Sequence, residues 1–399
     1  MAQHAEGSAP HGADDGLSRR ALLRRAGTGV VVMGGLPGLL AACGGGGGGG
    51  GGTAAAGATG TLDYFGWEGE DFKGVTETFL KSQNITLKAQ AMASIDDGVA
   101  KMQGGSGDGL DLMGLSGVAT PRVGAAQLLR PIDESKIPNL KNLAPSFSKE
   151  PPGPKQPSQI FDAEGRRMVV PTYFGTQGLT YDTAVIKTAP TSWHDVFKPE
   201  YKGKVGFYND PGIQYVSSAW ALGLNPAEVP KADIEKVVDF MDRLIDQVKG
   251  ISASIGDLTS AMVSGDVALA FTGYPAMDIF GAQAGKKTLK TTFDLKEGGF
   301  SYMEVLGIPK RSDNPEEAYA YINHLLDPKV NAAAADSVGG ATVVTGAQDH
   351  LSAVGRKLYP YATLDAFLKR SPLLPFPPLE SDQFVTQGDW AEKWTALTG

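Results

Sequence analysis

From Leu62 onward, short apolar segments alternate along the chain with segments whose apolar residues recur at helical spacing. Three segments have the length and composition of strands, at 62–65, 85–89 and 110–115. The intervening helices are predicted from residues 95–103 and from the face formed by Phe72, Val75, Phe79 and Leu80. Strand and helix units in this order favour an α/β fold in which helices cover both faces of a sheet.

Two later segments carry clear helix signals. Apolar residues keep one helical face from Ile234 to Val248, and we interpret this face as core rather than as a cofactor site. A second helix is predicted from Pro315, with Asn314 as its cap and acidic residues in its first turn. Both helices therefore belong to the scaffold.

An extended, glycine-marked segment at 169–181 is interpreted as a crossing between two lobes rather than as a core strand, and the strand end at 306–309 is interpreted as the return crossing. Because a long insert separates the crossings, each lobe is expected to be discontinuous in sequence. The predicted divisions are 1–42 for an export signal, 43–61 for a Gly/Ala-rich flexible linker, 62–172 plus 303–345 for lobe 1, and 173–302 plus 346–399 for lobe 2.

The N-terminal segment has the pattern of a bacterial lipoprotein signal. Arg19 and Arg20 match the pair of a twin-arginine export signal, and Leu40-Ala41-Ala42-Cys43 matches a lipobox, after which Cys43 would be the lipidated first residue. Residues 26–40 are too short and too glycine-rich for a membrane span of about 20 apolar residues. A signal-anchor helix and a buried core cysteine are the alternatives. The pattern predicts a lipid-anchored protein outside the cytoplasm.

The charge balance and the few cysteine and histidine residues argue against several classes of function. The chain has 36 basic and 44 acidic residues, a net charge of −8, which argues against nucleic acid and against a polybasic membrane surface. Cys43 is the single cysteine, and His194, His324 and His350 stand apart from other ligand-type residues at metal spacing. No catalytic residue, metal site or cofactor is predicted. An exported hydrolase using scattered carboxylates is the alternative from the enzyme class.

Several stretches in order resemble the polyamine-binding type of bacterial extracellular solute-binding protein. They are Val170-Pro171-Thr172-Tyr173-Phe174-Gly175-Thr176-Gln177-Gly178-Leu179, residues 190–205 from Pro190-Thr191-Ser192-Trp193 to Gly203-Lys204-Val205, Gly265-Asp266-Val267-Ala268-Leu269-Ala270, and Gly298-Gly299-Phe300-Ser301-Tyr302-Met303-Glu304 up to Lys310. The resemblance covers the chain beyond the linker.

The resemblance implies a binding protein of an ABC importer. Its fold would be the two-lobed, type II periplasmic-binding-protein fold, whose lobes are joined by hinge crossings and close over a small cation such as putrescine or spermidine. It further implies a monomer that delivers this ligand to a membrane permease and touches the membrane through its lipid alone. A receptor for an amino acid derivative, an opine-like compound or ferric iron remains the alternative.

The resemblance also implies ligand contacts in the first half of the chain. Trp67 is expected as an aromatic face for a cation, because indole is the best cation–π partner. Glu68 and Glu70 follow in the same loop, and Glu68 is the predicted carboxylate. Ser116 is expected as a hydroxyl contact, whereas Val118 replaces an expected tyrosine.

In the second half, Asp210 matches an amine-binding acid, while Ile213 replaces a second acid and argues against the longest polyamines. Phe271 and Tyr274 are expected to form an aromatic platform, and Tyr302 and Glu304 an aromatic and acid pair. Glu304 is the strongest candidate, because an acid in an apolar strand needs a partner. An internal salt bridge would be its structural explanation. Gln383 is a further possible contact.

Overall fold

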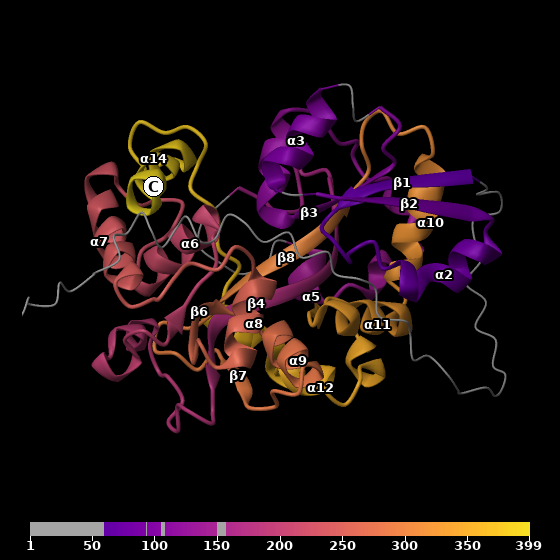
Figure 1. Cartoon of the computed structure of the whole chain (residues 1–399). Helices are drawn as coiled ribbons and strands as arrows, with labels where there is room; N and C mark the ends of the chain where they lie inside the picture. The colour runs from indigo at the N-terminus through magenta and orange to yellow at the C-terminus, as the bar shows by residue number, and fades with distance from the viewer. Residues whose placement is uncertain (1–59, 93, 105–107, 150–156) are drawn as a thin grey trace, which may run out of the picture.

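The computed structural model describes residues 60–92, 94–104, 108–149 and 157–399 (Figure 1). The predictions for the export signal, for Arg19, Arg20 and Cys43, and for the linker up to residue 59 lie outside these residues. Of the helices in the described ranges, none is both long enough and apolar enough to span a membrane.

One mixed sheet runs through the molecule in the order β2-β1-β3-β8-β4-β6-β5, and β7 and β9 also pair with β4. Strands β1, β2 and β3 are parallel, whereas β8 and β4 are antiparallel to their neighbours. The strands are β1 (Gly60–Gly66), β2 (Ile85–Ala91), β3 (Leu112–Ser116), β4 (Val170–Asp182), β5 (Val205–Gly206), β6 (Leu269–Gly273), β7 (Leu289–Thr292), β8 (Phe300–Gly307) and β9 (Ala341–Thr342).

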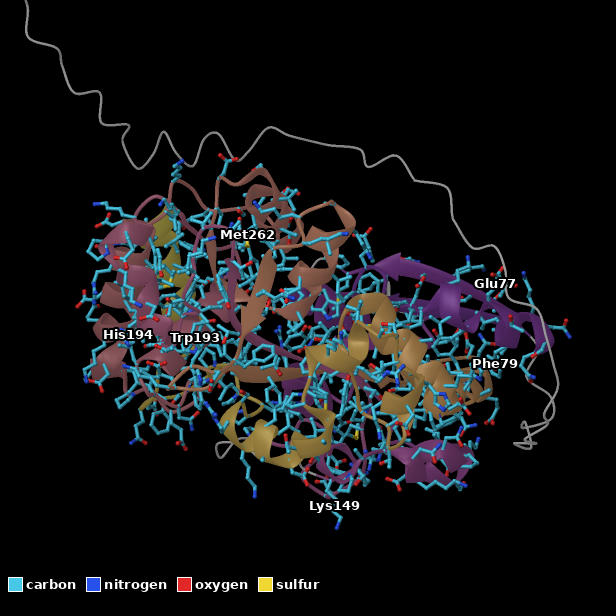
Figure 2. All side chains as sticks on the ribbon, turned by 90° about the horizontal axis from the view of Figure 1, so that it is seen from below. Glu77, Phe79, Lys149, Trp193, His194 and Met262 are labelled. Carbon is cyan, nitrogen blue, oxygen red and sulfur yellow. The ribbon has the colours of Figure 1, made fainter. Side chains whose placement is uncertain are left out.

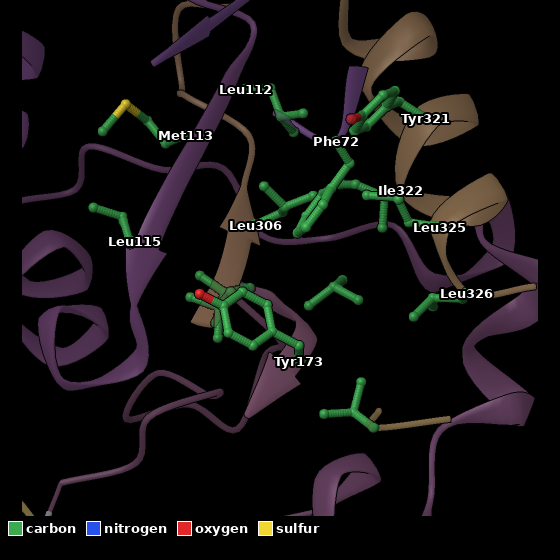
Figure 3. Packing of buried hydrophobic residues seen from close by; sticks show 14 of the residues in the cluster. Phe72, Leu112, Met113, Leu115, Tyr173, Leu306, Tyr321, Ile322, Leu325 and Leu326 are labelled. Atoms are coloured by element: carbon green, nitrogen blue, oxygen red, sulfur yellow. The ribbon is translucent and has the colours of Figure 1, made fainter. Parts of the chain in front are cut away.

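Lobe 1 is built on β1, β2 and β3 with one end of β4 and β8. Its core joins segments far apart in sequence, and Figure 3 shows Phe72, Leu306 and Ile322 within this cluster. Helix α10 packs against β1 and α2, while α3 lies against β3. The helices are α2 (Lys73–Ser82), α3 (Ile95–Gln103), α4 (Thr120–Ala125), α5 (Pro145–Ser148), α10 (Pro315–Leu325) and α11 (Pro328–Val338), with the short α12 (Gly355–Leu358) and α13 (Leu364–Arg370) following.

Lobe 2 has helices on both faces of its part of the sheet, as the alternation of elements predicts. Helices α6, α7 and α14 pack together, and α8 and α9 form the opposite layer (Figure 1). Trp193 and His194 of this lobe lie at the opposite end of the molecule from Glu77 and Phe79 on α2 (Figure 2). The helices are α6 (Pro211–Ala221), α7 (Ile234–Ile245), α8 (Ile255–Ser264), α9 (Pro275–Gln283) and α14 (Gln387–Thr398).

The crossing strand β4 differs from the prediction, because it is also a core strand. Nearly every residue of β4 is buried, and its two ends pair with different strands. Residues 170–177 pair with β8, while 178–182 pair with β6 and β7. A single strand therefore serves both lobes.

A third crossing lies at Leu373 and Leu374 rather than at 346. Buried side chains from Ala347 to Leu373 belong to the lobe 1 core, and those from Leu374 to Trp394 belong to the lobe 2 core. The Ser301 N–H donates to the Pro372 carbonyl at 2.7 Å, which holds the crossing against β8. The predicted assignment of 346–373 to lobe 2 differs from this packing.

Asn314 stands at the N-cap of α10, but its side chain does not cap the helix. Its Nδ2 donates instead to Oδ2 of Asp111 at 3.1 Å. Asp111 is fully buried and also accepts hydrogen bonds from the Asp63 and Asn314 N–H groups and from the Ser312 hydroxyl. This carboxylate ties the start of α10 to β1 and to the segment before β3.

Candidate functional site

A cleft of about 1580 Å³ lies between the lobes, where residues of both contribute to its walls. The floor comes from the crossing strands, and the walls come from loops at the strand ends of each lobe. Among the predicted residues, those that line it are Trp67, Glu68, Ser116, Asp210, Tyr274, Tyr302 and Glu304. The fold thus brings together most of a site predicted from distant segments.

Glu304 lies on the floor of the cleft with 6 % of its surface exposed. In the sheet it stands opposite Ser116 of β3 and Tyr173 of β4. Trp67 Nε1 donates a hydrogen bond to Glu304 Oε2 at 3.1 Å. Burial raises the pKa of Glu304 well above its usual value and the charge of Glu70 raises it further, whereas hydrogen bonds from Ser116 and Trp67 lower it.

Glu70 is the second carboxylate at this end of the cleft, and the prediction chose its neighbour Glu68 instead. The Glu70 N–H donates to the Trp67 carbonyl at 3.2 Å in a tight turn, and the Tyr173 hydroxyl donates to Glu70 Oε1 at 2.5 Å. Burial raises the pKa of Glu70 from 4.5 to about 7, and the bond from Tyr173 opposes this. Glu68 lines the cleft but is exposed.

Neither carboxylate has a basic partner among the residues that the structure describes. Within the described ranges, the charged groups that influence Glu304 and Glu70 include no lysine, arginine or histidine. The internal salt bridge that would explain Glu304 structurally is therefore not formed by the described residues. Buried anions without a cation are costly, so this end of the cleft favours a positively charged ligand.

Asp210 contributes a carboxylate from the lobe 2 wall. It is the N-cap of α6, where its Oδ1 accepts a hydrogen bond from the Ile213 N–H at 3.0 Å. Burial raises its pKa, and the N–H groups of Ile213 and Gly212 oppose this shift. Asp210 thus combines a local capping role with a position facing the cleft. Ile213 also lines the cleft.

Aromatic side chains supply much of the remaining wall. Tyr302 lies across Gly175 of β4, where a Cβ atom would come within 2.2 Å of the tyrosine ring. Tyr274 enters from the N-cap of α9. Tyr173 and Tyr208, which the prediction missed, also line the cleft. Burial raises the pKa of each of these hydroxyls, so they remain protonated hydrogen-bond donors.

Phe271 is a correction to the predicted site. It is fully buried in the lobe 2 core, 5.2 Å from the Trp193 ring between centroids, and it is not among the residues that line the cleft. Thr272 has a φ of 64°, so the chain changes direction there and Tyr274 is the residue presented to the cleft. Gln383 is exposed and does not line the cleft either, although its neighbour Phe384 does.

The described residues offer no cluster of three or more histidine, cysteine, aspartate or glutamate side chains that could hold a metal ion. His194 and His324 serve the scaffold. His194 bonds to the Ala221 carbonyl at 2.9 Å, and His324 stacks on Phe79 with ring centroids 4.0 Å apart. The chemistry that the cleft offers is binding through carboxylates, hydroxyls and aromatic faces.

The sequence is similar to those of periplasmic proteins that bind spermidine and putrescine. The chain is 28% identical over 308 residues to the spermidine/putrescine-binding periplasmic protein of Escherichia coli, which covers 76% of this chain and 84% of that protein. It is 26% identical over 277 residues to spermidine/putrescine-binding periplasmic protein 1 of Haemophilus influenzae, covering 69% and 72% of the two chains.

Solved structures share the fold. The substrate-binding protein PotD of a spermidine/putrescine ABC transporter from Streptococcus pneumoniae superposes with a TM-score of 0.67 at 21% identity, covering 85% of this chain and 97% of that one. A putative spermidine/putrescine ABC transporter protein from Listeria monocytogenes gives 0.68 at 20% identity, covering 84% and 98%. These likenesses confirm the predicted two-lobed α/β fold.

A family model described as bacterial extracellular solute-binding protein matches residues 74–357. The match includes both crossing strands, and the cleft lies where lobes of such a protein would enclose a solute. This family and the relatives named above are binding proteins of transport systems, not enzymes. The chain belongs to the bacterial extracellular solute-binding protein family.

Proposed function

We propose that this protein captures a small polyamine-like cation, such as putrescine or spermidine, in the cleft and delivers it to the permease of an ABC importer. The observation that carries the proposal is the pair Glu70 and Glu304, two carboxylates held beside Trp67 without a basic partner among the described residues. Relatives that bind spermidine and putrescine support the same ligand class.

The arrangement suits a cation with two ends. An ammonium at Glu70 and Glu304 would be held by lobe 1, next to the Trp67 ring, whose face attracts cations. A second ammonium could reach Asp210 on the lobe 2 wall. A ligand bridging the two walls would favour closure, and closure strengthens both charge pairs because it removes water from the cleft.

The proposal includes export and anchoring at the N-terminus. The Arg19-Arg20 pair would direct export, and Cys43 would carry the lipid that keeps the protein close to its permease. Mass spectrometry of the membrane-associated protein is expected to show a chain that begins at a lipid-modified Cys43. An unmodified thiol at this position would contradict the anchor without affecting the ligand.

Thermal unfolding with added ligands tests the ligand class. Putrescine and spermidine are each expected to raise the melting temperature by about 5 °C at a hundredfold excess over Kd, since binding to the folded state alone contributes about 2.7 kcal/mol under that condition. Amino acids and ferric citrate serve as comparison ligands. Stabilisation by one of these, with none by the amines, would overturn the polyamine assignment.

Glu304→Gln tests the site itself. The amide keeps the shape of the side chain but removes its charge, so amine affinity is expected to fall by 10- to 100-fold, in line with about 1.5 to 3 kcal/mol for a hydrogen bond to a charged group. Titration calorimetry measures the change. Glu235→Gln is a matched control, because Glu235 is an exposed acid on α7 that pairs with Lys393. Equal affinity in both variants would remove Glu304 from the site.

A further inference from the structure

The carboxylates of Glu70 and Glu304 are linked by one small network. The Trp67 indole N–H donates to Glu304, and the Tyr173 hydroxyl donates to Glu70. The backbone N–H of Glu70 also donates to the Trp67 carbonyl, so Glu70 and Trp67 lie in one turn. Tyr173 also stands opposite Glu304 in the sheet. The two acids are therefore held near each other by uncharged donors on both sides.

The other titratable groups around the pair are neutral or acidic. On β1 and the loop after it they are Tyr64 and Asp71, on β4 Tyr173, on β8 Tyr302, and at the start of α9 Tyr274. Tyr321 of α10 faces Tyr64 and Asp71. Arg122 of α4 also lines the cleft, but it pairs with Asp96. In the part of the chain that the structure describes, no basic group is among those that shift the pKa of Glu70 or Glu304.

Uncharged donors can stabilise one carboxylate but cannot neutralise two. Two carboxyl groups that share a poorly solvated site avoid full ionisation by keeping a proton, since burial and mutual repulsion both oppose the second charge. The raised pKa of Glu70, about 7, and that of Glu304 agree with this geometry. A bound ammonium would supply the missing positive charge.

We propose that amine binding in this cleft is a proton-for-ammonium exchange, in which the empty Glu70 and Glu304 pair holds one proton that the entering ammonium displaces. The inference rests on the proposed function, because it assumes that the ligand is an amine. The O–H bond of the carboxylic acid breaks, its proton passes to water or buffer, and the resulting carboxylate pairs with the ammonium, which keeps all of its own protons.

This exchange makes capture depend on pH. Alkylammonium groups keep their proton up to a pKa of about 10.4, so the ligand itself does not titrate near neutrality. Below a pH of about 7, protons compete with the amine, and affinity is expected to fall by up to about tenfold per pH unit. Once the pH is high enough for both acids of the empty pair to be ionised, affinity becomes independent of pH.

Titration calorimetry with putrescine in phosphate and in Tris buffer counts the protons directly, because the two buffers have different ionisation enthalpies. At pH 7, about 0.5 proton or more is expected to leave per putrescine bound, and this number is expected to fall as the pH rises. Equal observed enthalpies in both buffers at pH 7 would overturn the exchange while leaving amine binding in place. Absence of any heat with putrescine or spermidine would overturn the proposed function and the exchange together.

Proton release measured with the variants Glu70→Gln and Glu304→Gln tests whether the displaced proton comes from this pair of acids. Each variant removes one member of the pair, so the single remaining acid loses its like-charged neighbour and proton release at pH 7 is expected to fall by at least half. Glu77→Gln is the matched control, because Glu77 pairs with Lys81 on the exposed face of α2 and is not among the residues that line the cleft. Proton release that stays unchanged in both cleft variants would overturn the assignment.

Discussion

The Trp67 side chain contributes two groups to the cleft, an aromatic ring face and an indole N–H donor. Its ring face is available to a cation, and its Nε1 donates to Glu304 at 3.1 Å. Trp67→Phe keeps an aromatic face and removes the donor. Amine affinity is expected to fall about 10-fold or more, as for other hydrogen bonds to charged groups, and titration calorimetry measures it. Affinity equal to that of the natural protein would show that the indole N–H is dispensable.

Gly175 makes room for Tyr302 in the floor of the cleft. In Gly175→Ala, the new Cβ would lie within 2.2 Å of the tyrosine ring, so the ring must move. Overpacking of this kind costs about 1 to 3 kcal/mol of unfolding free energy, which urea denaturation measures, and amine affinity should fall as well. Gly74→Ala on α2 is the control, because an added Cβ there would have no atom within 4 Å apart from the neighbouring backbone of its own helix. This substitution is expected to be neutral or slightly stabilising.

The start of helix α10 depends on one buried carboxylate. Asp111 accepts hydrogen bonds from Asp63 of β1 and from Ser312 and Asn314, which lie together in the segment that leads into α10. Asp111→Ala leaves these donors unpaired in the interior, and the free energy of unfolding is expected to fall by about 3 kcal/mol or more. Urea denaturation is the measurement. A loss below about 1 kcal/mol would mean that water replaces the carboxylate.

The spacing of apolar residues predicted the regular helices and strands, but it did not predict the crossing at Leu373 and Leu374. The helix at 95–103 and the strands at 62–65 and 85–89 match observed elements to within a few residues, because their apolar spacing alone specifies them. Residues 347–373 contain only short helices, and which core their side chains enter depends on tertiary packing. The residue-level differences have a similar origin. The backbone turn at Thr272 leaves Phe271 in the core, and the hydrogen bond from Tyr173 that marks Glu70 joins segments far apart in the sequence.

At the scale of the whole molecule, the acid pair should link stability to pH. The pKa of Glu70 rises from 4.5 in the unfolded chain to about 7 in the fold, and that of Glu304 also rises. Between these values the folded state binds more protons than the unfolded state, so unfolding free energy decreases as pH rises from about 4.5 to 7. Glu70 alone is expected to contribute up to about 3 kcal/mol over this range, since one pKa unit is worth about 1.4 kcal/mol.

Urea denaturation at pH 5 and pH 7.5 measures this dependence, and the comparison with Glu304→Gln isolates it from other titrating groups. The variant should lose less stability than the natural protein over this range. Saturating putrescine should reverse the trend, because the bound ammonium stabilises the ionised acids. Identical pH dependence in the natural protein and the variant would contradict the link.

Because the chain crosses between lobes at Leu373 and Leu374, both hydrophobic cores need residues from close to its C-terminus. The core of lobe 2 includes Trp390 and Trp394 from α14, and the Trp390 indole donates to the Pro211 carbonyl at 2.7 Å at the start of α6. Lobe 1 in turn needs side chains up to Leu373. A growing chain therefore cannot complete either core until nearly all of it has been synthesised.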